Sequence, residues 1–106
     1  MSKQLNKLKA KIFHIEDFTQ ILKEWRSDDN KIVFTNGCFD LIHLGHLEIL
    51  ARSADLGDKL IVGINSDKSI KRIKGKSRPI IEEDSRAKQL AAIEFVDAVI
   101  LFNENT

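Results

Sequence analysis

The sequence has 106 residues, of which 42% are hydrophobic and 31% are charged, and its formal net charge at pH 7 is +1. A chain of this length builds one domain around one modest core, and the balanced charge gives no general attraction to nucleic acid or to an anionic membrane. The single cysteine excludes an internal disulfide and fits a reducing cytoplasm, and no apolar run approaches the roughly 20 residues that span a bilayer.

The first predicted elements lie within residues 1–26. Residues 1–14 are rich in lysine and weakly patterned, so we expect a basic leader, followed by one α/β domain over residues 15–106. An amphipathic helix is predicted over residues 16–26, because apolar side chains recur there at i, i+3, i+4 and i+7. These side chains are Phe18, Ile21, Leu22 and Trp25.

A continuous apolar run at residues 32–34 follows a turn-forming cluster at residues 27–30. The run is too short and too uninterrupted for a half-exposed strand, so it predicts a central strand that is buried on both faces. A helix is then expected from about residue 44 to residue 56. Gly57 follows it at the C′ position, where glycine commonly ends a helix.

The second half of the chain repeats this alternation. Residues 60–64 predict a second buried strand, and residues 69–73 predict a short helix. A third main helix is expected to start at residue 84 or 85 and to end near residue 95, before a strand at residues 98–102. Strands that alternate with helices predict right-handed βαβ units, and therefore an α/β fold with a Rossmann-like parallel sheet and flanking helices.

Two polar segments follow strands of this predicted sheet. Residues 36–40 come after the first strand, and residues 65–67 come after the second. Ligands of parallel sheets bind beyond the carboxyl ends of the strands. We therefore expect both segments to face one crevice.

The most informative stretch of the chain runs from Thr35 to His46, where a predicted strand, a glycine-containing turn and a helix start follow one another. Backbone N–H groups at a helix N-terminus have no partner within the helix and lie at the positive end of its dipole, so they attract anions. His43 and His46 are three residues apart and share one helical face. The pattern indicates a site that binds phosphate and stabilises charge developing on it.

Other interpretations of the two histidines are weaker. In isolation, a pair of histidines at a helix start is usually partly buried and satisfied by the backbone. A zinc site needs further ligands, and the chain offers only Cys38, ahead of the helix, and His14, in the leader. The neighbouring Asn36, Gly37 and Asp40 favour the phosphate-binding interpretation.

The residues between strand and helix have several possible roles. Gly37 suits a turn that approaches a phosphate closely or needs a positive φ. Cys38 contacts phosphate or substrate, or else is a small packed thiol, which we slightly prefer. Phe39 fits the core. Asp40 caps the helix, which is the most economical interpretation, or orients a histidine, or helps to hold a metal.

A family resemblance rests on these residues. His43, Gly45 and His46 match the H-x-G-H signature of the nucleotidyltransferase superfamily, to which cytidylyltransferases, adenylyltransferases and class I aminoacyl-tRNA synthetases belong. Residues 34–43, 56–58 and 65–67 resemble more narrowly the heptose-phosphate adenylyltransferase domains of ADP-heptose synthases, with glycerol-3-phosphate cytidylyltransferases as close relatives. The resemblance runs from about residue 31 to residue 104.

The resemblance implies a cytoplasmic enzyme that transfers AMP from ATP to a sugar phosphate such as heptose 1-phosphate and releases pyrophosphate. The alternatives are transfer of CMP from CTP to glycerol 3-phosphate, and a nucleotide-binding module without turnover. Mg²⁺ is expected as a cofactor that bridges the triphosphate oxygens. The implied partners are these small molecules, without nucleic acid or membrane.

The same resemblance assigns site residues. The catalytic residues would be His43, His46 and Lys74. Lys74 and Arg86 are the best matches to a lysine and an arginine that contact the triphosphate in the resembled enzymes, whereas Lys71 and Arg72 are weaker matches. The expected nucleotide or phosphate contacts are Thr35, Asn36, Gly37, Cys38, Phe39, Asp40, Gly45 and Arg86, and the expected pocket residues are Asn65, Ser66, Asp67, Lys71 and Arg72.

Residues 68–78 carry six basic side chains and no acidic one between them. Such a run is usually a solvated, mobile loop, and its place after the second strand also suits a lid over the β- and γ-phosphates. This run has no interleaved aromatic residues of the kind that stack on bases, which argues against nucleic-acid binding. Gly75, Lys76 and Ser77 are not the end of a P-loop, because that motif would require glycine in place of Ile70. No G-x-G-x-x-G pattern supports a dinucleotide cofactor.

Members of the resembled family continue for several elements beyond a position like Phe102. We therefore expect the sheet to hold the first half of the family's fold and the chain to be C-terminally short, or a fragment. An open strand edge invites pairing, so a homodimer is expected to cover it.

Overall fold

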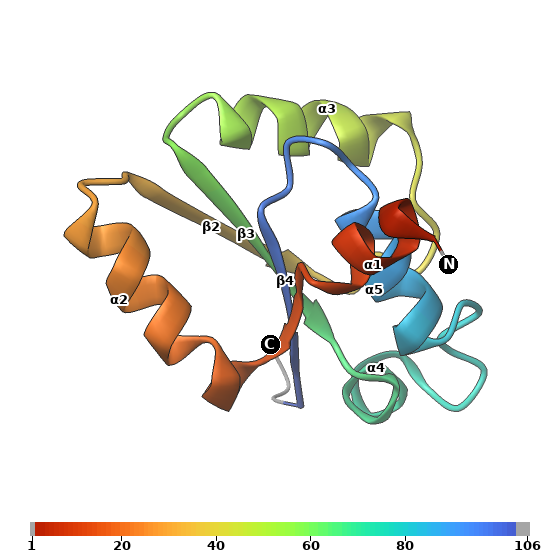
Figure 1. Ribbon diagram of the computed structural model, residues 1–106. Coiled ribbons are helices and arrows are strands. Elements are labelled where there is room, and N and C mark those ends of the chain that lie inside the picture. The colour runs from red at the N-terminus through yellow and green to blue at the C-terminus, as the bar shows by residue number, and fades with distance from the viewer. Residues whose placement is uncertain (1, 104–106) are drawn as a thin grey trace.

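A computed structural model describes residues 2–103 (Figure 1). Its four strands form one wholly parallel sheet in the order β1-β4-β3-β2, with helices on both faces. The predicted Rossmann-like α/β fold is confirmed. The strands are β1 (Ile12–His14), β2 (Ile32–Gly37), β3 (Lys59–Asn65) and β4 (Ala98–Phe102); the helices are α1 (Lys3–Lys9), the 3₁₀ turn η1 (Ile15–Asp17), α2 (Thr19–Ser27), α3 (Leu44–Ala54), α4 (Asp67–Lys74) and α5 (Glu83–Ala91).

Alternate residues of the central strands supply the two sides of the core. On one face Leu60, Val62 and Ile64 of β3 pack with buried residues of α3 and α5, whereas on the other face Ile61 packs with the side chains of α2. Figure 1 shows α2 alone on its side of the sheet, opposite α1, α3 and α5. The apolar spacing that predicted α2 is confirmed, because Phe18 lies 5.4 Å from the Trp25 ring inside this second cluster.

The predicted leader is part of the sheet. Residues 12–14 form β1, which pairs in parallel with β4, and Ile12 packs against the main core. Ser2 caps α1 by accepting from the backbone N–H of Leu5. The predicted boundary between a leader and a domain at residue 15 therefore lies inside one folded unit. The short strand escapes sequence analysis because only three residues of it lie in the ladder, between lysines and a 3₁₀ turn.

The prediction of a central, fully buried strand at residues 32–34 is wrong in two respects. The strand extends to Gly37, and it has β3 on one side and no other strand of residues 2–103 on the other. In addition, 58% of the Phe34 surface is exposed. The continuous apolar run predicts burial on both faces of the sheet. On the face that α2 covers, however, Ile32 is packed and Phe34 is exposed.

The helix boundaries differ from prediction by a few residues. The turn η1 precedes α2, and α5 ends at Ala91 rather than near residue 95. Gly57 is not a left-handed C′ glycine, since Asp55 is the C-cap and only Gly75 has a positive φ among the described glycines. A Cβ on Gly57 would lie 2.7 Å from the carbonyl oxygen of Lys31, so this glycine allows a close approach of the chain. No helix of residues 2–103 is long and apolar enough to cross a membrane.

Candidate functional site

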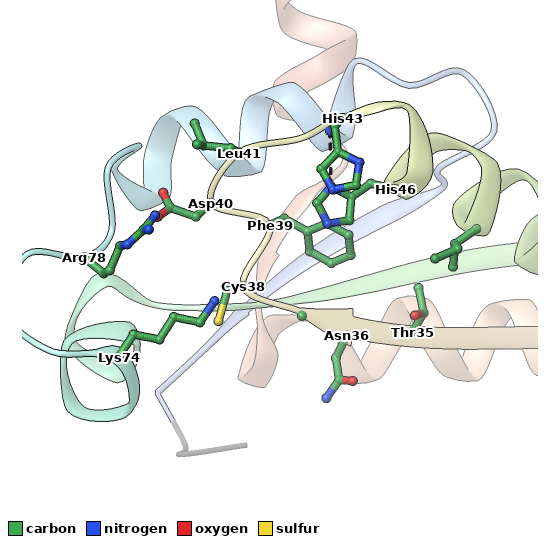
Figure 2. Close-up of a pocket in the computed structure, with 12 residues that line it drawn as sticks. Thr35, Asn36, Cys38, Phe39, Asp40, Leu41, His43, His46, Lys74 and Arg78 are labelled. Carbon is green, nitrogen blue, oxygen red and sulfur yellow. Dashed lines mark hydrogen bonds and ion pairs between the residues drawn. The ribbon is translucent and has the colours of Figure 1, made fainter.

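A cavity of about 420 Å³ opens at the carboxyl end of β2, where the β2–α3 loop meets the segment after α4 (Figure 2). Residues 35–40 line it, as expected for a strand end in a parallel sheet. Figure 2 shows the two imidazoles on one side of the view and the long basic side chains on the other. The lining residues are Thr35, Asn36, Gly37, Cys38, Phe39, Asp40, Leu41, His43, His46, Ile49, Lys74 and Arg78.

The two histidines of the cavity cap the helix that carries them. His43 is the N-cap of α3, and its Nδ1 accepts from the backbone N–H of Gly45 at 3.1 Å. The backbone N–H of His43 donates to Nδ1 of His46 at 3.2 Å. A nitrogen that accepts a hydrogen bond carries no proton, so the neutral ring of each histidine holds its proton on Nε2. Both residues therefore present an Nε2–H donor.

The two rings are stacked, and the surroundings of His46 favour its neutral form. They stack with centroids 3.9 Å apart and planes 29° apart, and the Phe39 ring lies 5.3 Å from His46 on a tilted plane. Burial lowers the pKa of His46 below its ordinary 6.5, and the neighbouring His43 lowers it further. His46 is therefore uncharged at pH 7 and acts as a neutral donor.

Gly45 lies between these histidines and has a steric role. A Cβ at this position would lie 2.9 Å from Cε1 of His43. The absence of a side chain lets the His43 ring fold back over the helix start and accept the Gly45 N–H. Gly45 itself does not line the cavity.

The turn between β2 and α3 is built around Phe39. This residue has a φ of 49°, in the left-handed region that few non-glycine residues adopt. Of the two roles that the sequence suggested for Gly37, close approach or a positive φ, the positive φ is not found. Its hydrogen side chain instead makes room for the Phe39 ring, because a Cβ on Gly37 would lie 3.0 Å from Cε2 of Phe39.

Asp40 does not cap α3, contrary to the most economical interpretation of the sequence. Only 8% of its surface is exposed, and its carboxylate accepts from the backbone N–H groups of Ile80 and Ile81, each at 2.8 Å, and from Nη1 of Arg78 at 3.3 Å. Burial alone would raise the pKa of Asp40, but the two amides and the guanidinium outweigh it and hold the pKa below its usual value. The carboxylate ties the β2–α3 loop to the loop after α4.

The basic stretch divides between a helix and a loop. Residues 67–74 form α4, and its last residue, Lys74, lines the cavity as the sequence suggested. Arg78, in the following loop, also lines it and was not among the expected site residues. Arg78 is the last basic residue of the run at residues 68–78, but the sequence alone does not show which side chains of this run reach the cavity. Lys71 and Arg72 are exposed and lie outside the lining, and Arg72 donates to the carbonyl of Asn103.

The segment 65–67 lies beside the cavity and not in its lining. Sγ of Cys38 is 3.6 Å from Oδ1 of Asn65, so the two strand ends are adjacent, as predicted. Asn65 is fully buried and donates to Ser69, however, and Ser66 is the N-cap of α4. These residues build the start of α4, and the cavity opens on the β2 side of them.

Arg86 also lies outside the cavity. Its side chain is fully buried, and it donates hydrogen bonds to the backbone of Cys38 and Asn65 and to the carboxylate of Asp67. The triphosphate contact predicted for Arg86 would therefore require the guanidinium to leave these partners. In sequence, a lone arginine at a helix start gives no sign of whether it points into the core or into solvent.

Comparisons with known proteins agree with this geometry. Residues 34–106 match the family model described as Cytidylyltransferase-like. The chain is 48% identical over 97 residues to the bifunctional protein HldE of Koribacter versatilis, and 53% identical over 96 residues to that of Campylobacter jejuni strain RM1221. These matches cover 92% and 91% of this chain but 20% of each relative, so the chain spans about a fifth of the length of these relatives.

A solved structure is also similar. It is the lipopolysaccharide core biosynthesis protein from Thermoplasma volcanium GSS1, at 39% sequence identity and a TM-score of 0.63. The match covers 70% of this chain and 59% of that one.

Proposed function

Because the chain belongs to the cytidylyltransferase-like family, we propose that its cavity binds a nucleoside triphosphate and that the protein is a nucleotidyltransferase. The observation that carries the proposal is the pair of capped imidazoles, His43 and His46, each with its proton on Nε2. The same cavity contains the cationic side chains of Lys74 and Arg78. Two imidazole N–H donors and two cations suit a chain of phosphates better than an uncharged ligand.

The proposed reaction joins the nucleoside monophosphate to a phosphate group of the acceptor. An acceptor phosphate oxygen attacks the α-phosphorus and forms a new P–O bond, while the bond from the α-phosphorus to the bridging oxygen breaks. Pyrophosphate leaves with the electron pair. The second pKa of a phosphate monoester is about 6, so the nucleophile is already ionised at pH 7 and needs no general base.

The residues of the cavity then supply position and charge stabilisation. Nε2–H of His43 and of His46 would donate to oxygens of the α-phosphate, where negative charge builds up in the transition state. Lys74 and Arg78 would bind the β- and γ-phosphates, which become the leaving group. Arg78 is already held near the cavity by Asp40, so little of its side-chain freedom remains to be lost on binding.

Mg²⁺ is proposed as the companion of the triphosphate rather than as a resident of the protein. Within residues 2–103 no group of three or more histidine, cysteine, aspartate or glutamate side chains is arranged to hold a metal ion. The one buried carboxylate at the cavity, Asp40, already accepts two backbone N–H groups and a guanidinium. The metal would therefore be held mainly by phosphate oxygens, and no step above depends on it.

We propose ATP as the donor and a sugar phosphate such as heptose 1-phosphate as the acceptor. The similarity of residues 34–43 and 65–67 to heptose-phosphate adenylyltransferase domains supports this choice. The similarity to a lipopolysaccharide core biosynthesis protein agrees with a sugar acceptor. The alternative is CTP with glycerol 3-phosphate. Pyrophosphate release measured with each donor and each acceptor separates them: release from ATP with heptose 1-phosphate supports the proposal, and release only from CTP contradicts it.

A nucleotide-binding module without turnover is the second candidate. The cavity is compatible with it as well, because imidazole and cationic side chains beside a helix start can bind phosphates without a reaction following. Calorimetry beside the pyrophosphate assay distinguishes the two functions. Nucleotide binding without pyrophosphate release from any donor and acceptor pair would establish the module and refute the enzyme.

We also propose a homodimer formed through β2. This strand has no neighbour on one side among the described residues, and it contains neither proline nor a charged side chain to discourage pairing. Exposed Phe34 and a groove of about 330 Å³ between α2 and β2 extend the apolar surface next to this edge. Antiparallel pairing of two β2 edges would continue the sheet across both copies.

A further inference from the structure

Arg86 is the largest fully buried side chain among the described residues, and it lies directly behind the cavity. It makes four hydrogen bonds. Nε donates to the carbonyl of Ile81 at 2.9 Å, Nη1 donates to the carbonyls of Cys38 at 2.8 Å and Asn65 at 2.7 Å, and Nη2 donates to the carboxylate of Asp67 at 2.7 Å. These bonds use four of the five N–H donors that a guanidinium has.

The four acceptors belong to the segments that surround the cavity. Cys38 follows β2 and lines the cavity, and Asn65 ends β3. Asp67 begins α4, the helix that places Lys74 in the cavity. Ile81 lies in the loop whose N–H groups bind Asp40. One rigid, planar group therefore fixes the relative position of four chain segments that are distant in sequence.

The bond to Cys38 has a consequence for the imidazoles. The carbonyl of Cys38 and the N–H of Phe39 belong to one peptide plane, so a donor that holds this carbonyl also restricts φ of Phe39. That φ is 49°, a left-handed conformation that is unfavourable for an ordinary L-residue and persists only when its surroundings enforce it. The Phe39 ring in turn lies 5.3 Å from the ring of His46.

Arg86 has little alternative to this position. A buried charge requires a complete set of partners, and Asp67, 28% exposed, is the one anionic partner of Arg86 within residues 2–103. Moving the guanidinium into the cavity would break four hydrogen bonds and leave the carbonyls of Cys38 and Asn65 without their donor.

From these contacts we infer that Arg86 is a positioning residue: it holds the Cys38–Phe39 peptide and, through the Phe39 ring, sets the orientation of His46. It touches no phosphate. This inference rests on the proposed function for its effect on nucleotide binding, but the effect on His46 itself does not depend on that function.

The first test measures the imidazole signals of the apo protein by NMR in Arg86→Lys and Arg86→Gln. The chain has only three histidines, so the signals are easily assigned. We expect the His46 signals to move while those of exposed His14 stay in place. Asp67→Asn is the matched control, since it keeps an oxygen acceptor but removes the charge, and its His46 signals should stay near those of the wild type. Unmoved His46 signals in folded Arg86 variants, or an equal movement in Asp67→Asn, would overturn the inference.

The second test compares ATP with AMP by calorimetry, at a temperature where circular dichroism shows each variant to be folded. A positioning role predicts that Arg86→Lys weakens both ligands by the same factor, about tenfold, the change that corresponds to about 1.4 kcal/mol. Selective loss of ATP affinity would instead show a direct contact with the triphosphate tail. A lower melting temperature with both affinities unchanged would show a purely structural role, and either result overturns the inference.

The role of Arg86 can be tested even if the proposed function is wrong or if the Arg86 variants do not fold. If the wild-type protein binds neither nucleotide, the proposed function fails while the NMR test still decides the role of Arg86. If neither Arg86 variant folds, Asp67→Ala removes one acceptor of Arg86 at a partly exposed position. It is expected to move the His46 signals away from those of Asp67→Asn, and unmoved signals would overturn the inference.

Discussion

The backbone N–H of His43 donates to Nδ1 of His46, so the helix cap and the cavity share the same imidazoles. Nδ1 of His43 accepts from Gly45 in the same way. Because both caps use Nδ1, both Nε2–H groups are left as donors for a ligand. A helix N-terminus thus fixes the tautomers of the two residues proposed for catalysis.

Replacing His46 with alanine should reduce the rate of pyrophosphate release by roughly 100-fold or more, because one preorganised donor to the transition state is lost. The helix start also loses an acceptor, so folding must be confirmed by circular dichroism. His14→Ala is the control, since His14 is exposed on β1 and does not line this cavity. Full activity of His46→Ala would contradict the proposed role.

Stability should depend on the protonation of His46. Its pKa in the folded protein is lowered from 6.5, so the unfolded chain binds the proton more readily than the folded protein does. The free energy of unfolding should therefore be fully present above pH 6.5 and fall as the pH decreases from there towards the lowered pKa. Urea unfolding between about pH 7 and pH 5 measures this slope, in a range above the ordinary titration of carboxylates near 4.

His46→Asn is the matched variant for this pH dependence. Its side-chain oxygen can accept the N–H of His43 but has no proton to gain in this range. The part of the slope that belongs to His46 should disappear in this variant. An identical slope in both proteins would exclude His46 as its source.

Asp40→Asn should destabilise the protein by about 1–3 kcal/mol, the usual consequence of removing a partner from buried polar groups. The amide retains one oxygen for the N–H groups of Ile80 and Ile81, but its NH₂ group faces the Arg78 guanidinium. Urea unfolding measures the loss, and faster tryptic cleavage after Lys76 would report the released loop. Asp84→Asn is the control, because its ion pair with Lys88 is exposed and should contribute less than about 1 kcal/mol.

Lys74→Met should weaken the binding of ATP about tenfold or more and leave the binding of AMP nearly unchanged. A hydrogen bond to a charged group contributes about 1.5–3 kcal/mol, and Lys74 is proposed to contact only the phosphates that leave. Lys71→Met makes the same change of charge on the same helix but outside the cavity lining, so its affinity for ATP should stay that of the wild type. Equal losses in the two variants would indicate a general electrostatic effect rather than a contact.

Phe34→Lys should shift the proposed dimer towards monomer, because a charged side chain on an edge strand opposes pairing. Light scattering coupled to size-exclusion chromatography, over a range of protein concentrations, measures the change. Leu5→Lys is the control, since Leu5 is also exposed (43% against 58%) and lies on α1, which packs against α5. A wild-type protein that remains monomeric at all concentrations would refute the dimer.

Much of the architecture could be predicted from local patterns. The apolar runs at residues 60–64 and 98–102 predicted β3 and β4, and the spacing from Phe18 to Trp25 predicted α2. The apolar residues that form these patterns are the ones that pack in the core, so the local pattern is sufficient to predict the element. The prediction is wrong where the local pattern is short or ambiguous. Residues 12–14 are predicted as part of a basic leader but form β1, and residues 32–34 are predicted as a central strand but lie in β2, at the edge of the described sheet.

The site shows the same division at the level of side chains. Residues 35–40, His43, His46 and Lys74 were placed at the cavity from sequence, since they lie at a strand end or a helix end whose position the alternation of elements determines. Asp40 and Arg86 were assigned roles that the structure does not give them in this arrangement. The partners of Asp40 are 38 to 41 residues away in sequence, and Arg86 binds the carbonyl of Cys38, which is 48 residues away.

By itself, the sequence determined the parallel α/β fold, the crevice at its carboxyl edge and the pair of histidines at a helix start, because periodicity and motif spacing are local properties of the chain. Only the tertiary structure decided which nitrogen of each imidazole carries the proton, which cations reach the cavity, and that Arg86 lies behind the cavity rather than in it. Those outcomes depend on packing between segments distant along the chain, where a buried donor takes whichever acceptors the assembled fold brings within reach.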